Sequence, residues 1–187
     1  MPGSEGSLAQ HMAVHIVEMN LVAPLCAACA ARLWANPAIE RIGLATLVQV
    51  LFLWGWHTPA IFALASANPI AMAAMHLSLF AAAVWFWSSV IAHLRTASWT
   101  PIAALLVTGK LFCLLGLLLT FAPRAIYAGA SIPALESAHV LADQQLAGLL
   151  MLAACPVVYV GAAIIVARRW LAEIKRAPGW SYREGAA

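Results

Sequence analysis

Five long apolar stretches divide the chain, and each is long enough to cross a lipid bilayer as a helix. They cover about residues 11–33, 42–64, 70–91, 102–121 and 141–166, where one span needs about 20 mostly apolar residues. The stretches are continuous and rich in alanine and leucine, which favours helices over alternating strands. The pattern predicts an all-α protein. We expect a polytopic transmembrane helix bundle of about five spans, a single transmembrane domain over residues 1–187, with 167–187 as a cytoplasmic tail.

The composition agrees with this interpretation. Of the 187 residues, 64% are hydrophobic and 9% are charged, and the mean hydropathy is +0.90. A soluble domain is usually about 45–50% apolar and about 25% charged. These values argue against a soluble enzyme, a nucleic-acid-binding protein and a disordered scaffold.

Basic residues flank the predicted spans asymmetrically. If the N-terminus lies outside, only Arg124 flanks a span on the outer side. The other flanking basic residues then lie on the inner side: Arg32, Arg41, Arg95, Arg168, Arg169, Lys175, Arg176 and Arg183. The positive-inside rule therefore predicts an outside N-terminus and a cytoplasmic C-terminus.

Breaks in the pattern predict local irregularities. Pro24, Pro59 and Pro156 lie within spans, and each should kink its helix because it removes one backbone donor. We expect residues 123–140 to form an irregular outer loop. The segment after Trp170 is expected to form a short interfacial helix that then frays.

Ionisable side chains inside spans are costly, at about 2.5–3.5 kcal/mol near the bilayer centre, and they usually have a function. With the predicted orientation, five of the six histidines fall in the outer half of the membrane, and His93 alone lies at the inner face. Lys110 lies near the middle of its span. We expect it to pair with Glu18 or, as the alternative, with Asp143.

The sharpest polar pattern opens the first span. At about 100° per residue, a helix places His11, Met12, His15, Glu18 and Met19 on one arc of about 120°. An i,i+4 histidine pair on such an arc can supply two ligands to one metal ion.

Other spans add candidate ligands at similar depth. A third ligand could come from His57 or His76, and Asp143 could orient an imidazole through its second nitrogen. Gln144 and Met151 share one face of the fifth span. Imidazole binds many transition ions, whereas methionine sulfur selects Cu(I). The alternative is that the histidines hydrogen-bond across the bundle and the methionines fill space.

The cysteines are a weaker signal. Cys26 and Cys29 form a Cys-x-x-Cys pair that could act as a copper relay or redox pair. The interpretation as small residues at a helix contact is favoured, because the pair lies below the level of the histidines. Covalent attachment of c-type haem is excluded, since Ala30 follows where a histidine is needed. We expect Cys113 and Cys155 to be packing residues.

Four motifs together resemble the CtaG-type cytochrome c oxidase assembly factors of bacteria. They cover residues 11–151 in the order found in that family. They are His11-Met12-x-x-His15 with Met19 and Pro24 following, Trp56-His57-Thr58-Pro59, His76, and Asp143-Gln144-Gln145-x-x-Gly148 with Met151. Many relatives are longer and have extra spans, and Cys26 and Cys29 are not part of the pattern.

The resemblance implies a multi-pass protein of the bacterial inner membrane that matures a haem–copper oxidase by supplying copper. It implies these shared functional positions: His11, His15, His57, His76, Asp143 and Met151. We therefore expect a metallochaperone, not an enzyme, that binds copper as Cu(I) near the periplasmic face. Its expected partners are an oxidase subunit, a copper donor protein, the lipid bilayer and a second copy forming a homodimer, with no nucleic acid.

Two alternatives remain open from the sequence. One is a b-type haem electron-transfer protein with His57 and His76 as axial ligands. The other is a structural subunit of an oxidase complex with no metal of its own.

Overall fold

The computed structural model describes residues 7–30, 41–94, 98–127 and 134–176. Its helices are α1 (Leu8–Val17), the π-helical turn η1 (Glu18–Val22), α2 (Ala23–Ala30), α3 (Ile42–Trp56), α4 (Pro59–Ala67), α5 (Pro69–His93), α6 (Thr100–Phe121) and α7 (Ala134–Arg176). No strand occurs within these ranges, so the predicted all-α class is confirmed.

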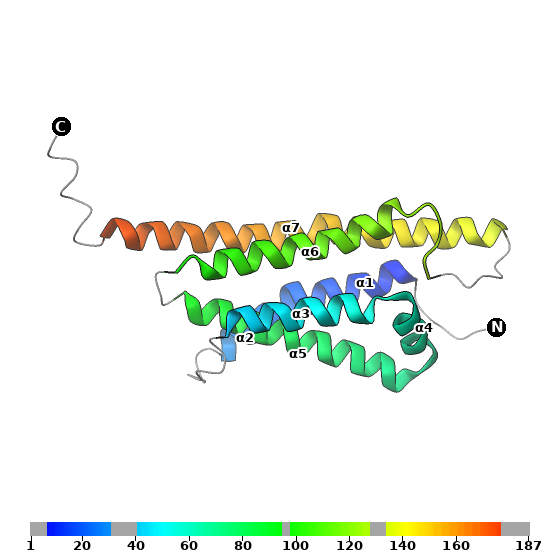
Figure 1. Cartoon of the computed structure of the whole chain (residues 1–187), viewed down its shortest axis with the longest axis horizontal. Coiled ribbons are helices and arrows are strands. Elements are labelled where there is room, and N and C mark those ends of the chain that lie inside the picture. Colours follow the sequence, from blue (N-terminus) through cyan, green and yellow to red (C-terminus); the bar gives the residue numbers. More distant parts are fainter. Residues whose placement is uncertain (1–6, 31–40, 95–97, 128–133, 177–187) are drawn as a thin grey trace.

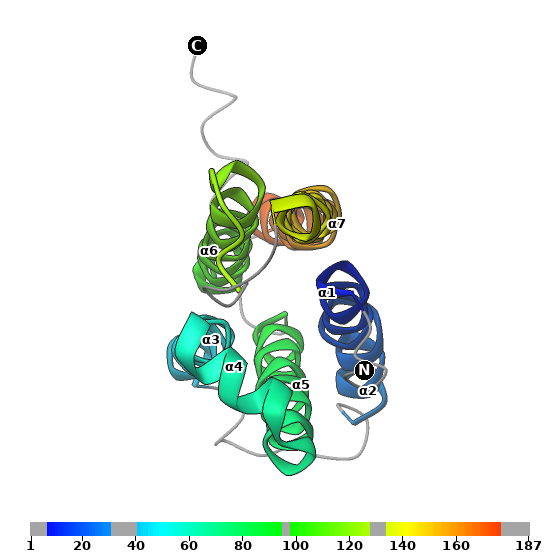
Figure 2. The ribbon, with the colours of Figure 1, turned by 90° about the vertical axis from the view of Figure 1, so that its right-hand side faces the viewer.

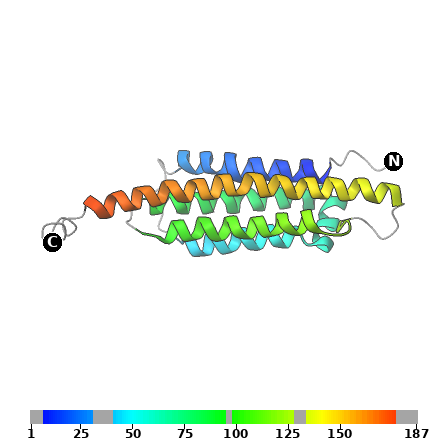
Figure 3. The same ribbon diagram turned by 90° about the horizontal axis from the view of Figure 1, so that it is seen from above.

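The long helices run side by side in one elongated bundle (Figures 1 and 3). Viewed along the bundle, α6 and α7 form one closely packed pair, and α3, α5 and the α1–α2 helix complete it (Figure 2). α1 packs on α7, α2 packs on α5, and α3 packs on both α5 and α6. Figure 1 places the start of α1, the α4 segment and the start of α7 at the same end of the bundle.

The helices are long and apolar enough to cross a membrane. Four spans are unbroken: Leu8–Ala30, Pro69–His93, Thr100–Phe121 and Ser137–Arg176. A fifth is formed if α3 and α4, bent by 74° to each other, are counted as one broken span. Large apolar side chains such as Ile70 (78% exposed) and Val157 (73% exposed) cover the outside, as expected of a surface that faces lipid tails. Four such helices, or five spans if the bent pair is counted as one, agree with the predicted bundle of about five spans, and the orientation remains a prediction.

Two predicted boundaries were wrong. Residues 134–140, expected in an irregular loop, already belong to α7, because the segment from Ala134 contains neither glycine nor proline before Gly148. The helix expected after Trp170 is present, but it is continuous with the last span, because α7 runs through Pro156 to Arg176 and does not end near residue 166. The residues after Trp170 are mostly strong helix formers, so nothing ends the helix there.

Pro24 explains the π-helical turn in the first span. In η1 the backbone N–H of Ala23 bonds to the carbonyl of Glu18, five residues back. The next donor in that pattern would be position 24, which is a proline without an N–H, so the carbonyl of Met19 loses its helical partner. The indole Nε1–H of Trp87, on α5, takes this place at 2.9 Å. The turn is thus fixed by a named side chain of a neighbouring helix.

Small residues allow α6 and α7 to approach closely. A Cβ atom added to Gly148 would lie 2.5 Å from the carbonyl oxygen of Gly116 and would also meet Thr120. This contact of small residues is typical of helix pairs in membranes. It sets the position of α7, which also packs on α1.

Candidate metal centre

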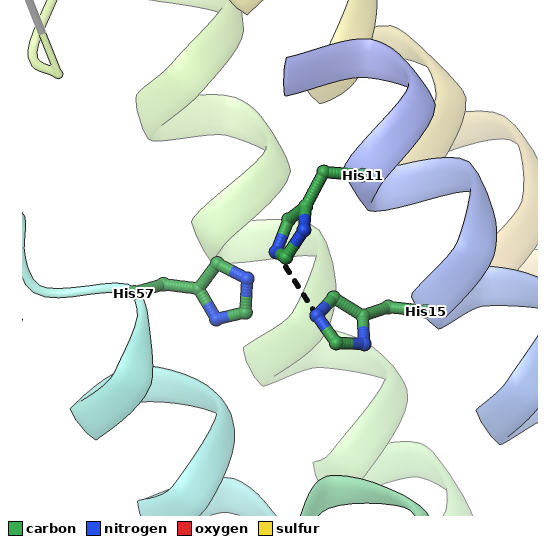
Figure 4. A group of neighbouring side chains, drawn as sticks. All are labelled: His11, His15 and His57. Atoms are coloured by element: carbon green, nitrogen blue, oxygen red, sulfur yellow. Dashed lines mark hydrogen bonds between the residues drawn. The ribbon is translucent and has the colours of Figure 1, made fainter. Parts of the chain in front are cut away.

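The structure brings four of the predicted histidines together. His11 and His15 lie one turn apart on α1, His57 lies at the break between α3 and α4, and His76 lies on α5. The ring centroid of His11 lies 4.4 Å from that of His15 and 5.4 Å from that of His76. The ring centroids of His15 and His57 are 5.6 Å apart. In Figure 4 the rings of His11, His15 and His57 converge on one point between the helices.

The break between α3 and α4 determines the position of His57. The residue before a proline is disfavoured in the helical region, and Thr58 is extended, with φ −69° and ψ 140°. α3 therefore ends at Trp56, and α4 begins at Pro59 in a new direction. The kink predicted at Pro59 is a full break of 74°. His57 is buried at this corner and faces α1.

The hydrogen bonds of two histidines leave a ring nitrogen free for a ligand. The Nδ1–H of His57 donates to the carbonyl of Leu53 at 2.7 Å, and its buried Nε2 has no hydrogen-bond partner in the described part of the chain. The Nδ1 of His76 lies 3.1 Å from Oε2 of Glu18. A histidine that donates from one ring nitrogen presents the lone pair of the other, which is the usual arrangement in metal sites.

Two overlapping groups of side chains are spaced to hold a metal ion. One nitrogen from each of His11, His15 and His57 lies within 4.8 Å of the others. The Nε2 atoms of His11 and His15 are 3.0 Å apart, close to the spacing of two nitrogens that each lie about 2.0 Å from one ion. A second group joins His15 and His76 to the carboxylate of Glu18. The first group offers only neutral imidazoles, whereas the second includes a harder oxygen ligand.

A cavity of about 600 Å³ adjoins the centre, and His11 and His76 both line it. Its other walls come from α1, α4, α5, the segment after α6 and α7. They include Leu8, Val14, Phe62, Ser66, Met72, Tyr127, Val140 and Gln144. His11 and His76 are therefore the two histidines of the group that this cavity reaches.

Aromatic residues that the sequence did not indicate support His57. The hydroxyl of Tyr127 donates to the carbonyl of His57 at 2.7 Å, and burial raises the pKa of Tyr127 to about 12, which keeps this hydroxyl protonated. The ring of Phe62 packs on Tyr127 with centroids 4.7 Å apart, and on His11 at 5.3 Å. Phe62 follows a helix break and Tyr127 lies in a loop, so no periodic pattern could have placed them.

A family model described as cytochrome c oxidase caa3 assembly factor matches residues 4–173 of the 187. The chain belongs to the caa3 oxidase assembly factor family. The predicted resemblance is confirmed, and the matched range contains every residue of the centre. The comparisons with curated proteins and with solved structures found no match.

Two of the predicted supporting residues of this assembly factor, Asp143 and Gln144, bond to backbone groups of other segments. The carboxylate of Asp143 accepts the backbone N–H of Leu8 at 2.6 Å and of Ala9 at 3.4 Å, and so holds the start of α1. Gln144 accepts the N–H of Ile126 at 2.7 Å and thereby positions the segment after α6.

The predicted pairing of Lys110 was wrong. Its side chain is exposed on α6, and the structure pairs it with neither Glu18 nor Asp143. Glu18 instead faces His15 on its own helix and His76 on α5. The depth of Lys110 in its span was predictable, but its direction around the helix was not.

The sulfur-containing residues divide into two groups. Cys26 and Cys29 are free thiols exposed on α2, away from the histidines. Met12, Met19 and Met151 are buried and line a small cavity of their own, which His15 also lines.

Proposed function

We propose that this assembly factor binds one Cu(I) ion through His11, His15 and His57 and supplies it to a maturing cytochrome c oxidase. The observation that carries the proposal is the convergence of three imidazole nitrogens within 4.8 Å of one another. It occurs in a member of a family that assembles a copper-containing type of oxidase.

The chemistry of the centre favours a monovalent ion. Three neutral imidazoles leave the charge of the ion uncompensated, and in a buried site this costs far more for a divalent ion than for Cu(I). The alternative group, with the carboxylate of Glu18, would suit a harder ion. Cu(I) is also the ion for which nearby thioethers are suitable ligands.

Delivery requires a route to and from the centre. The large cavity beside His11 and His76 offers one, with Met72 among its walls as a further soft ligand. If the N-terminus faces outside, this end of the bundle lies at the periplasmic side of a bacterial inner membrane. A periplasmic copper donor and an oxidase subunit would then reach the same face.

Copper binding by the purified, full-length protein in detergent tests the proposal. Copper is supplied as Cu(I) without oxygen, in competition with a Cu(I) chelator, and bound metal is measured by elemental analysis. His11→Ala and His57→Ala should each lose one equivalent of Cu(I) per chain. His139→Ala is the matched control, because His139 is exposed on α7, and it should bind as the unmodified protein does. Full binding by both site variants would refute the proposed ligand set.

Topology and cellular copper supply are tested separately. Reporter fusions after Ala67 and after Arg124 should both report a periplasmic position, since both follow outward-running spans in the predicted orientation. Cells carrying His57→Ala should contain oxidase with less copper than cells carrying His139→Ala. Cytoplasmic fusion results would overturn delivery at the outer face without affecting the metal site.

A further inference from the structure

A second cavity lies in the interior of the bundle, separate from the large one. Its volume is about 10 Å³, close to the space that one water molecule occupies. Its polar and sulfur-containing walls are Met12, His15, Met19, Asn20, Met151 and Cys155, and its apolar walls are Ile16, Leu53 and Phe112. Helices α1, η1, α3, α6 and α7 all contribute.

The sulfur atoms of this cavity come from two facing helices at helical spacing. Met12 and Met19 are seven residues apart on the first span, and Met151 and Cys155 are four apart on α7. All four side chains are at most 3% exposed. Three thioethers and one thiol are soft ligands, which disfavour hard ions such as Mg²⁺ or Ca²⁺, and a set dominated by thioethers favours Cu(I).

An unpartnered polar group in the cavity wall points independently to a ligand. Asn20 is 3% exposed, and its Nδ2 reaches Sγ of Cys155 at 3.7 Å. Its Oδ1 has no hydrogen-bond partner among the residues that the structure describes. Leaving such an atom buried and unpaired is costly. Asn20 lies in the π-helical turn, and turns of this kind occur frequently at functional sites.

We propose that this cavity is a second Cu(I) site, in which Met12, Met19, Met151 and Cys155 hold one dehydrated ion. The choice of metal rests on the proposed function. Cys155 binds as the thiolate and its proton is released to solvent, so the negative sulfur cancels the single charge of Cu(I) in the apolar interior. The bound Cu(I) also gives the unpaired side-chain oxygen of Asn20 a positively charged neighbour.

His15 links the two sites. It belongs to the three-histidine group and also lines the sulfur cavity. Copper held on the sulfur atoms is therefore next to a ligand of the outer centre. The inner site acts as a holding position from which the histidine centre is refilled.

Stoichiometry and X-ray absorption test this inference on the full-length protein with Cu(I). The unmodified protein should bind two equivalents. The double variant Met151→Leu/Cys155→Ala should bind one equivalent, with nitrogen scatterers only. The matched control is Met75→Leu/Cys113→Ala, which changes a buried methionine and a cysteine outside the cavity and should still bind two. His11→Ala/His57→Ala should keep one equivalent with sulfur scatterers.

The outcomes separate the two proposals. One equivalent in the unmodified protein, unchanged in the Met151→Leu/Cys155→Ala variant, overturns the inner site and leaves the histidine centre standing. If the Met151→Leu/Cys155→Ala variant loses copper and the His11→Ala/His57→Ala variant does not, the histidine centre is refuted and the inner site is supported. If the cavity variant does not fold, the His11→Ala/His57→Ala protein decides alone, since remaining copper without sulfur scatterers contradicts the inference.

Discussion

The Nδ1 atom of His76 lies 3.1 Å from Oε2 of Glu18, and the same carboxylate oxygen lies 3.6 Å from Nδ1 of His15. One carboxylate at the end of α1 thus contacts imidazoles from two helices. Both contacts use Nδ1, and Nε2 of His15 lies 3.0 Å from Nε2 of His11. Carboxylates that hold ligating histidines in this way fix the ring orientation and raise the basicity of the ligand.

Replacing Glu18 by glutamine should therefore weaken Cu(I) binding at the histidine centre by roughly 10–100-fold. The neutral amide holds both rings less firmly, while the size of the side chain is kept. Affinity is measured by chelator competition. Glu173→Gln, at the exposed end of α7, is the control and should leave affinity unchanged. Equal affinities for the two variants would mean that Glu18 has no orienting role.

Asp143→Ala should destabilise the start of α1. The carboxylate holds two backbone N–H groups, and hydrogen bonds to a charged partner contribute about 1.5–3 kcal/mol each at most. Ser7→Ala removes only the neutral cap that Ser7 provides to Gln10 at 3.2 Å, so its effect should be smaller, about 0.5–1 kcal/mol. Unfolding of both variants is followed in detergent. A larger effect for Ser7→Ala would contradict this role of Asp143.

Trp87→Phe should cost about 1–3 kcal/mol, because it leaves the carbonyl of Met19 buried without a donor. Pro24→Ala supplies the backbone N–H that is missing from this turn, so it should lower the cost of losing the indole. The double variant should therefore be more stable than the sum of the two single effects predicts. Additive free energies of unfolding would show that Trp87 and Pro24 do not act on the same carbonyl.

Gly148→Ala should separate α6 from α7 and destabilise the bundle by about 1–3 kcal/mol or more, because the new methyl group meets the backbone of Gly116. Gly161→Ala, on the same helix, is the matched control, since nothing lies within 4 Å of its added Cβ. Thermal unfolding in one detergent compares them. Similar unfolding temperatures would show that the close approach of the two helices is not required.

The sequence was sufficient to predict which histidines meet. His11 and His15 are one turn apart, and the depths of His57 and His76 follow from counting residues along their spans at about 1.5 Å each. Depth and helical phase are properties of single helices. For that reason they can be obtained before any packing is known.

The features that the sequence did not predict depend on how the helices face one another. Lys110 and Glu18 were paired on depth alone, but Lys110 points outward and Glu18 faces two histidines. The π-helical turn also shifts the helical phase after Glu18, so a regular arc cannot be extended to Asn20. Cys155, taken for a packing residue, became a candidate ligand only when α7 was placed against α1.

The broken second span has a consequence for how the protein is inserted into its membrane. α3, with 15 residues, is about 22 Å long and α4, with nine, about 14 Å, so neither half alone crosses a hydrocarbon layer of about 30 Å. The exposed backbone at the corner is tolerated only where protein covers it, and here Tyr127 bonds to the carbonyl of His57. The corner at His57 is therefore covered only when the segment after α6, which carries Tyr127, packs beside it, so we expect a chain that ends before Tyr127 to lack this cover.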